Sequence, residues 1–457
     1  MFERLLGRRR AAPGVAGPAR SEQDRREPVS AAPASRMASA RPGAGSAAEG
    51  APQKAPGDAF TPTRPSAGRR HIVGRQAELE RILLALRDER AHVVLYAERG
   101  SGKTSLSNLV IETLRRSGVM VTRNTCDAAS SFDSIIRGLM RELPASLLAA
   151  RAEGGTGEGC EPALPPGELR PGDVASLLSR LTCRSLVCVV DEFDRVQDDT
   201  TRTRLADTIK QVSDRGTALS FMVVGVSENL EEILGRHPSI QRNISALHLP
   251  LLDDEAVAAL LARGSQAIAL TFPPAVVATI VRLCRGMPYI AQLLGLRTAQ
   301  MAFLRNETTV TEADLAAVVK RLIADTRPTV TERYAVLTEN GQDAEMVMAL
   351  RRIALARHDP WGRLDVAFGP GIVAIGGQSI PAECWMRLRT AGVLSASGAK
   401  PDLVAFEDRG LLTYILLLAA QADALLHQPG AAGHAAPNDA PRRARLVAAQ
   451  ARAAETA

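Results

Sequence analysis

A single stretch of the sequence, 92–104, limits most strongly what this chain can fold into. It reads HVVLYAERGSGKT and includes Val93–Tyr96, an apolar run typical of a β-strand. The run ends in a loop with two glycines, and the residues after Thr104 begin the amphipathic pattern of a helix. A strand, a glycine-rich loop and a helix in this order form a phosphate-binding loop. The stretch therefore predicts an α/β domain built on a parallel sheet.

The residue types in this loop suit the triphosphate of a nucleotide. Gly100 and Gly102 let the backbone turn its N–H groups toward an anion, where side chains would obstruct it. The helix that opens at Gly102 adds the partial positive charge of its N-terminus. Lys103 is placed to reach the β- and γ-phosphates, and the Thr104 hydroxyl to bind Mg²⁺. We expect these loop positions to contact the nucleotide: Ala97, Gly100, Ser101, Gly102, Lys103, Thr104 and Ser105.

One loop position departs from the pattern G-x-x-x-x-G-K-[ST], because Ala97 stands where the first glycine is expected. That position turns the chain out of the strand, whereas Gly100 and Gly102 lie nearer to the phosphates. The alternative interpretation is a chance Gly-Ser-Gly loop, which the strand before it and the helix after it disfavour. We therefore predict nucleoside triphosphate binding with alanine at this position.

A second apolar run, 185–190, is followed by Asp191 and Glu192. A continuous apolar run suits a strand that is buried on both faces of a parallel sheet, and ligands of such sheets bind at the carboxyl ends of the strands. We predict that Asp191 orients the Mg²⁺ shell and that Glu192 activates the attacking water. Because neighbouring side chains of a strand point to opposite sides, the two carboxylates can divide these roles. The alternative is a strand that merely ends in solvated acids.

A third motif, V-G-R-x-x-E-L, begins at Val73, directly upstream of the loop. With the two other motifs following in order, the sequence resembles AAA+ ATPases of the origin-recognition and replication-initiator type, and the related STAND signalling ATPases. In those families the motif wraps the adenine and ribose. The resemblance therefore implies that the nucleotide is ATP and that Val73, Gly74 and Arg75 help to bind it.

The resemblance also implies polar residues that act on the γ-phosphate. Ser227 or Asn229, at the exit of the apolar strand 219–226, matches the sensor that hydrogen-bonds the γ-phosphate or the lytic water. Arg242 lies just before the next strand, where these ATPases have the arginine finger that reaches a neighbour's nucleotide, and Arg236 is a second candidate. For either arginine, a surface ion pair with a nearby glutamate is an equally good interpretation.

A helical pattern follows at 253–325, where the resemblance implies a helical lid. Gly286–Tyr289 interrupts it at the point where the family has G-x-P followed by a sensor arginine. Tyr289 stands at the arginine position, with Arg285 and Arg297 on either side as possible substitutes. This departure leaves open how nucleotide closes the lid.

Residues 326–426 form a separate region whose pattern is compatible with a winged helix. The expected elements are helices at Ala344–Arg357, Pro381–Ala391 and 411–426, a Gly- and Pro-rich excursion at 365–378, and an extended segment at 393–406 that contains a turn. A winged helix would place Pro381–Ala391 in the major groove of DNA. However, only Arg387, Arg389 and Lys400 supply positive charge there, which is little for a domain that neutralises several phosphates. A DNA contact and a protein contact therefore both remain open.

The charge of the chain is unevenly distributed. Residues 1–70 contain 13 Lys and Arg against 6 Asp and Glu, whereas the whole chain has a net charge of +6, so the remainder is close to neutral. Residues 1–70 are rich in Ala, Pro, Gly, Ser and Arg, and the tail at 427–457 is rich in Ala, Pro and Arg. Segments of this composition bury too little apolar surface to offset the entropy of ordering, so we expect both to be disordered. The basic excess of the first could also contact duplex DNA.

Three features indicate a cytoplasmic protein without a membrane segment. The N-terminal sequence lacks the apolar core of a signal peptide. The most apolar stretch, 411–426, is interrupted by polar residues and is too short to span a bilayer. The six cysteines show neither C-x-x-C spacing nor paired histidines, and we interpret them as reduced thiols.

These observations predict a P-loop NTPase of the additional-strand class, with an all-α lid and a winged-helix-like C-terminal domain. The predicted divisions are a disordered tail at 1–70, an α/β nucleotide-binding domain at 71–252, the lid at 253–325, the C-terminal domain at 326–426 and a tail at 427–457. The predicted function is slow Mg-ATP hydrolysis that drives a conformational or assembly switch, with duplex DNA and further copies of the chain as partners. A STAND-like ATPase with a protein-binding C-terminal domain is one alternative, and a nucleotide-binding structural module without turnover is another.

Overall fold

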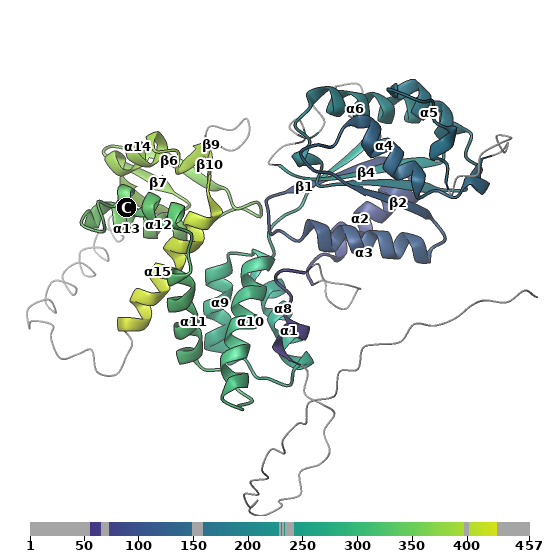
Figure 1. The fold of residues 1–457 in the computed structure, drawn as a ribbon. Coiled ribbons are helices and arrows are strands. Elements are labelled where there is room, and N and C mark those ends of the chain that lie inside the picture. The colour runs from purple at the N-terminus through teal and green to yellow at the C-terminus, as the bar shows by residue number, and fades with distance from the viewer. Residues whose placement is uncertain are drawn as a thin grey trace, which may run out of the picture. The chain divides into compact units, whose positions relative to one another are not determined.

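Two sheets and their surrounding helices make up the part of the chain that the structure, a computed structural model, describes (Figure 1). The described residues are 55–64, 73–148, 159–227, 230, 233, 242–396 and 402–426. They all fall within one of the two compact units of the chain, 52–457, and the other unit, 1–51, lies outside the described residues.

The first sheet is parallel, with the strand order β2-β3-β4-β1-β5. Its strands are β1 (His92–Ala97), β2 (Met120–Thr125), β3 (Leu186–Asp191), β4 (Leu219–Val226) and β5 (Ile244–His248). Strand β4 thus lies between β1, which leads into the glycine-rich loop, and β3, which ends at Asp191. An extra strand at this place defines the predicted class of P-loop NTPase, so the predicted fold class is confirmed for this domain.

Helices cover both faces of this sheet (Figure 1). Because neighbouring strand residues point to opposite faces, Val187 and Val189 pack with one helix layer, and Cys188 and Val190 with the other. The first layer contains α2 (Gln76–Arg87) and α3 (Lys103–Arg116), and the second contains α4 (Phe132–Arg141), α5 (Pro171–Ser179) and α6 (Asp199–Asp214). This domain also contains the short 3₁₀ helices η2 (Ala145–Leu147), η3 (Glu161–Ala163) and η4 (Phe193–Arg195).

The lid is all-helical, as predicted, and consists of α8 (Asp254–Ala267), α9 (Pro274–Cys284), α10 (Pro288–Leu304) and α11 (Glu312–Ala324). An N-terminal segment completes its core: α1 (Pro56–Ala59) is followed by Phe60, which is 1% exposed. A Cβ atom at Gly264 or Gly295 would lie 2.2 Å or 2.8 Å from the Phe60 ring, so two glycines make room for it. The prediction of disorder for 1–70 is therefore wrong for residues 55–64, because burial of this aromatic ring stabilises a Pro- and Ala-rich segment.

The C-terminal region combines helices with an antiparallel sheet of order β8-β7-β6-β10-β9. Its elements are α12 (Pro328–Leu337), α13 (Ala344–Leu355), β6 (Leu364–Gly369), β7 (Ile372–Ile375), β8 (Gln378–Pro381), α14 (Ala382–Thr390), β9 (Leu394–Ala396), β10 (Leu403–Phe406) and α15 (Arg409–Leu426). A helix followed by the hairpin β9–β10 agrees with the predicted winged-helix-like domain. The expected excursion at 365–378 is instead the strand pair β6–β7 and the start of β8. No helix among the described residues is long and apolar enough to cross a membrane.

Candidate nucleotide-binding site

The glycine-rich loop joins β1 to α3 at the carboxyl edge of the parallel sheet. Gly100 and Gly102 have φ angles of +84° and +94°, a backbone conformation that side chains disfavour. Gly102 is also the N-cap of α3, so the free N–H groups of the first helical turn face the loop. The sequence therefore places glycine at the two loop positions where the backbone requires it.

Ala97 differs from the two glycines because it is still part of the strand. It is the last residue of β1, it is 2% exposed, and it pairs in parallel with Val226 of β4. An extended residue in a parallel strand has no need for a positive φ. The alanine at the first motif position therefore introduces no strain into the loop.

Lys103 is folded back over this loop. Its Nζ donates hydrogen bonds to the carbonyl oxygens of Ala97 at 2.9 Å and Glu98 at 2.8 Å. Burial lowers the pKa of Lys103 to about 8, against the opposite effect of Asp194, Asp191 and Glu98. Since an ammonium group has three N–H donors, these two bonds hold the side chain in place and leave one donor for a phosphate oxygen.

The predicted entry motif lies against the loop. Arg75 is 5% exposed, and its Nη2 donates to the carbonyl of Ser101 at 3.2 Å while its Nη1 lies 3.3 Å from the Glu78 carboxylate. Gly74 has a φ of +66°, and a Cβ there would lie 2.4 Å from the Cβ of Ala256 on α8. The motif is thus wedged between the glycine-rich loop and the first lid helix, with Val73 beside it and packed against the apolar core of the lid.

Asp191 ends β3 and is 2% exposed. Its Oδ1 accepts the Glu192 backbone N–H at 2.9 Å, and its Oδ2 accepts a hydrogen bond from the guanidinium of Arg123 on β2. Thr104 lies in the first turn of α3. A carboxylate and a hydroxyl are the hard oxygen donors that Mg²⁺ prefers, so these two residues fit the ion. No group of three or more His, Cys, Asp and Glu side chains among the described residues could hold a metal.

Glu192 does not continue the strand. Its φ is +54°, it precedes the 3₁₀ helix η4, and its carboxylate is 2.8 Å from the guanidinium of Arg195. The expectation that strand alternation separates the roles of Asp191 and Glu192 is therefore wrong, because the chain turns at Glu192 itself. A non-glycine residue in the left-handed region is strained, and such strain is frequent at active sites.

Ser227 follows β4 and is 7% exposed. Beside it, Asp194 accepts the backbone N–H of Val226 at 2.7 Å. Among the carboxylates that raise the pKa of Lys103, Asp194 has the largest effect. Asp194 is not among the predicted site residues, although the acidic run D-E-F-D at 191–194 gives a signal for it.

Arg242 is exposed and lies just before β5, which is where the finger was predicted. The other sensor and finger candidates, Asn229 and Arg236, lie outside the described residues.

Comparison with known proteins identifies this part of the chain. Residues 71–224 match the AAA ATPase domain family. This segment is an AAA ATPase domain. It contains the glycine-rich loop, the entry motif and the Asp191–Glu192 pair, so nucleotide binding is the shared property of the family and of this geometry.

Several solved structures are similar over most of the chain. A Walker-type ATPase of Pyrococcus abyssi is 16% identical, with 78% of this chain and 98% of that chain covered and a TM-score of 0.46. The ORC2 protein of Aeropyrum pernix, in ADPNP–ADP complexes, is 14% identical, with 81% and 99% covered and a TM-score of 0.45. The ORC1 protein of Aeropyrum pernix in complex with DNA is 16% identical, with 81% and 98% covered and a TM-score of 0.40. No curated protein matches the sequence.

The lid contacts the loop of the AAA ATPase domain through α10. The backbone N–H of Tyr289 donates to the carbonyl of Gly100 at 3.4 Å, and a Cβ at Gly100 would lie 3.2 Å from the Tyr289 Cβ. The two proposed substitute arginines are engaged elsewhere. Arg285 donates to the carbonyl of Ala354, and burial lowers its pKa to about 10; Arg297 donates to Gln300 at 3.3 Å. Tyr289, at the position of the expected sensor arginine, thus lies against the loop.

The C-terminal region also contacts the loop of the AAA ATPase domain. Arg409, the first residue of α15, donates to the carboxylate of Glu98. Nearby, the Trp361 ring stacks on His248 at 5.8 Å between ring centroids, and His248 stacks on Tyr96 of β1 at 4.8 Å. A loop residue, a sheet edge and the C-terminal region are therefore in direct contact.

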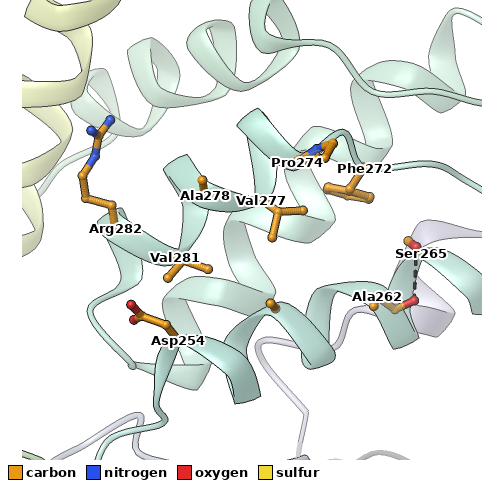
Figure 2. Close-up of a pocket in the computed structure, with 10 residues that line it drawn as sticks. Asp254, Ala262, Ser265, Phe272, Pro274, Val277, Ala278, Val281 and Arg282 are labelled. Atoms are coloured by element: carbon orange, nitrogen blue, oxygen red, sulfur yellow. Dashed lines mark hydrogen bonds between the residues drawn. The ribbon is translucent and has the colours of Figure 1, made fainter.

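A large open groove lies away from these residues, between α8 and α9 of the lid. Figure 2 shows its apolar side chains, and its volume is about 740 Å³. Its lining includes Phe272, Val277 and Val281, but none of the residues predicted to bind nucleotide. This groove is therefore not part of the candidate nucleotide site. That site consists of the backbone of the glycine-rich loop and the charged side chains around it.

Proposed function

We propose that the chain binds Mg-ATP, hydrolyses it slowly and uses the bound nucleotide as a conformational or assembly switch. One observation supports the switch above all: three separate segments contact residues within 98–101 of the glycine-rich loop. Arg409 contacts Glu98, Tyr289 contacts Gly100 and Arg75 contacts Ser101. A triphosphate would bind to the same loop, so its arrival or loss would change contacts to the lid and to the C-terminal region together.

Each residue of the site has a role in this proposal. Lys103 and the N–H groups of residues 100–105 bind the phosphates. Thr104 and Asp191 hold Mg²⁺, which neutralises charge on the transferred phosphoryl group. Glu192 accepts a proton from the attacking water. The remaining two residues stabilise the γ-phosphate: Ser227 from within the subunit, and Arg242 from a neighbouring subunit in an ATP-dependent homo-oligomer.

The arrangement of Glu192 supports slow turnover. Its carboxylate is 2.8 Å from the guanidinium of Arg195, so the proposed base must leave this partner before it can contact the attacking water. The tyrosine at position 289 has no cation to offer the γ-phosphate, unlike the arginine expected there. Both features reduce stabilisation of the transition state more than they reduce binding.

The test compares ATP binding and turnover in the full chain and in Glu192→Gln. We expect the variant to bind ATP with an affinity within about threefold of the wild type, since the substitution leaves the phosphate ligands in place. Its turnover should fall by about 100-fold or more, the usual contribution of a general base. Glu80→Gln, on the exposed face of α2, serves as the control for loss of one carboxylate. Unchanged hydrolysis in Glu192→Gln would remove this residue from the mechanism.

Duplex DNA is the partner class that we propose for the C-terminal region, and a protein partner is the alternative. The helix α14 precedes the hairpin β9–β10, which is the arrangement of a DNA-reading helix and its wing. The alternative has one observation in its favour: Arg387 forms an intramolecular ion pair with Asp343 at 2.6 Å. Arg389, stacked over Trp385 at 5.5 Å, remains at the surface of this helix.

Steady-state ATP turnover against increasing duplex DNA at low salt distinguishes the two partner classes. Stimulation that falls in Arg389→Ala, but not in the lid control Arg321→Ala, would support the DNA interface. A flat curve with a measurable basal rate would favour the signalling-type alternative with a protein partner.

A further inference from the structure

Arg123 forms a connection that the predicted site does not include. It lies on β2, and its guanidinium donates to Asp191 Oδ2 and, through Nη1, to Asn108 Oδ1 of α3 at 2.8 Å. The third guanidinium nitrogen, Nε, is buried without a hydrogen-bond partner. Arg123 thus bridges the strand that ends in the Mg²⁺-binding carboxylate and the helix that begins with Lys103.

The sheet topology places this arginine at the metal site. β2 and β3 are parallel neighbours, with Arg123 opposite Val189 and Thr125 opposite Asp191. Val121 and Val189 both pack in the core layer that contains α3. Since residues two apart share a face of the sheet, Arg123 and Asp191 point to that same side.

Both oxygens of Asp191 are engaged: Oδ1 by the Glu192 N–H, Oδ2 by Arg123. The Asp191 side chain is 3% exposed and that of Arg123 is 29% exposed. A buried carboxylate without a counter-charge is costly, so a cation must accompany Asp191 whether or not nucleotide is bound. A guanidinium and a metal shell cannot both hold the same carboxylate oxygen at full strength.

We propose that Arg123 neutralises Asp191 in the nucleotide-free protein and that Mg-nucleotide displaces its guanidinium. Arg123 therefore sets the Mg²⁺ concentration at which nucleotide binds fully. It acts through Asp191 and is a positioning residue. This inference rests on the proposed Mg-ATP function and adds a competition at its metal site.

A neighbouring hollow offers the displaced guanidinium of Arg123 another position. A surface hollow of about 380 Å³ is lined by Asn108, Ile111, Glu112, Arg115, Arg116 and Arg123. Glu112 is one helical turn below Asn108 on α3, and its carboxylate pairs with the exposed Arg116. Release from Asp191 leaves Arg123 within a hollow that already contains a carboxylate.

The experiment measures binding of a non-hydrolysable ATP analogue to the full chain over a Mg²⁺ titration. In Arg123→Gln we expect the half-saturating Mg²⁺ concentration to fall by about tenfold, the effect of removing one competing charge-assisted hydrogen bond. Arg87→Gln, which removes an exposed charge from α2 outside the hollow, should match the wild type. Arg123→Lys keeps the charge and should stay closer to the wild type than Arg123→Gln.

A Mg²⁺ midpoint in folded Arg123→Gln equal to that of Arg87→Gln would overturn the inference while leaving nucleotide binding intact. Wild-type protein that fails to bind the analogue at any Mg²⁺ concentration would instead overturn the proposed function, and this inference with it. If Arg123→Gln does not fold, NMR of the wild type tests the inference through the side-chain Nε–H resonance of Arg123. It should shift with Mg-analogue and stay in place with the analogue in EDTA, and equal spectra in the two conditions would contradict displacement.

Discussion

The two halves of the site differ in where their charged groups find partners. Lys103 bonds to carbonyls of its own loop, six and five positions before it in the chain. Asp191 pairs with Arg123, which is 68 positions away and on another strand. The first arrangement follows from local sequence, and the second requires the sheet to be assembled. The comparison teaches that the phosphate-binding half is organised by short-range backbone geometry, and the metal-binding half by the tertiary fold.

The largest expected effect tests the local half. Lys103→Ala should weaken ATP binding by about 100-fold, because a charge-assisted bond to phosphate disappears from a buried position. Isothermal titration or a fluorescent ATP analogue measures the change. The exposed Lys210→Ala on α6 is the matched control. Equal affinities in the two variants would show that the loop does not bind phosphate through this lysine.

A second prediction concerns the opposite end of β1 from the loop. His92 is 2% exposed; its Nδ1 accepts the Phe221 N–H at 2.9 Å, and its Nε2 lies 2.8 Å from Ser213 Oγ. The Ser213 hydroxyl itself donates to Ile209, which assigns the proton of the neutral ring to Nε2. Burial lowers the pKa of His92 from 6.5 to about 4.

A lowered histidine pKa means that protonation favours the unfolded chain. The contribution of His92 to stability is therefore complete above pH 6.5 and is lost as the pH falls toward 4. Between pH 7 and pH 5 the loss should be about 2 kcal/mol. Urea unfolding of the wild type and His92→Gln measures it as the difference between their pH slopes. Parallel slopes would contradict a buried neutral imidazole at the base of the sheet.

The same division between local and tertiary origin explains what the sequence could predict. The glycine-rich loop, its strand and its helix follow from neighbouring residues, and so does the buried strand that ends at Asp191. Phe60 could not be predicted, because its only signal is one aromatic ring in a Pro- and Ala-rich segment. The space for its ring is left by glycines at 264 and 295, which are distant in sequence.

Other differences have local causes that the sequence contains but that are easily overlooked. The strands β6 and β7 lie in a glycine-rich stretch, where Val366 and Val373 are buried and their neighbours are more exposed, so alternation of period two was present. The turn at Glu192 has no such signal, because glutamate rarely adopts a positive φ. The partner of Asp191 also had no signal, since Arg123 is one of many arginines and only the parallel pairing of β2 with β3 selects it.

The smallest expected effect concerns the metal-binding half of the site, at the exposed residue Glu192. Glu192 and Arg195 are 46% and 57% exposed, and an ion pair in such a position contributes at most about 1 kcal/mol. Arg195→Gln should therefore raise ATP turnover by no more than about fivefold, by freeing the carboxylate to accept a proton from water. Its ATP affinity should stay at the wild-type value, because Arg195 contacts Glu192 and not the loop. A rise that vanishes in the double variant with Glu192→Gln would show that the arginine acts through this acid. A fall in turnover would show instead that the ion pair holds Glu192 in the position it needs for catalysis. The metal-binding half of the site would then be fixed in place before nucleotide binds, as the phosphate-binding half is.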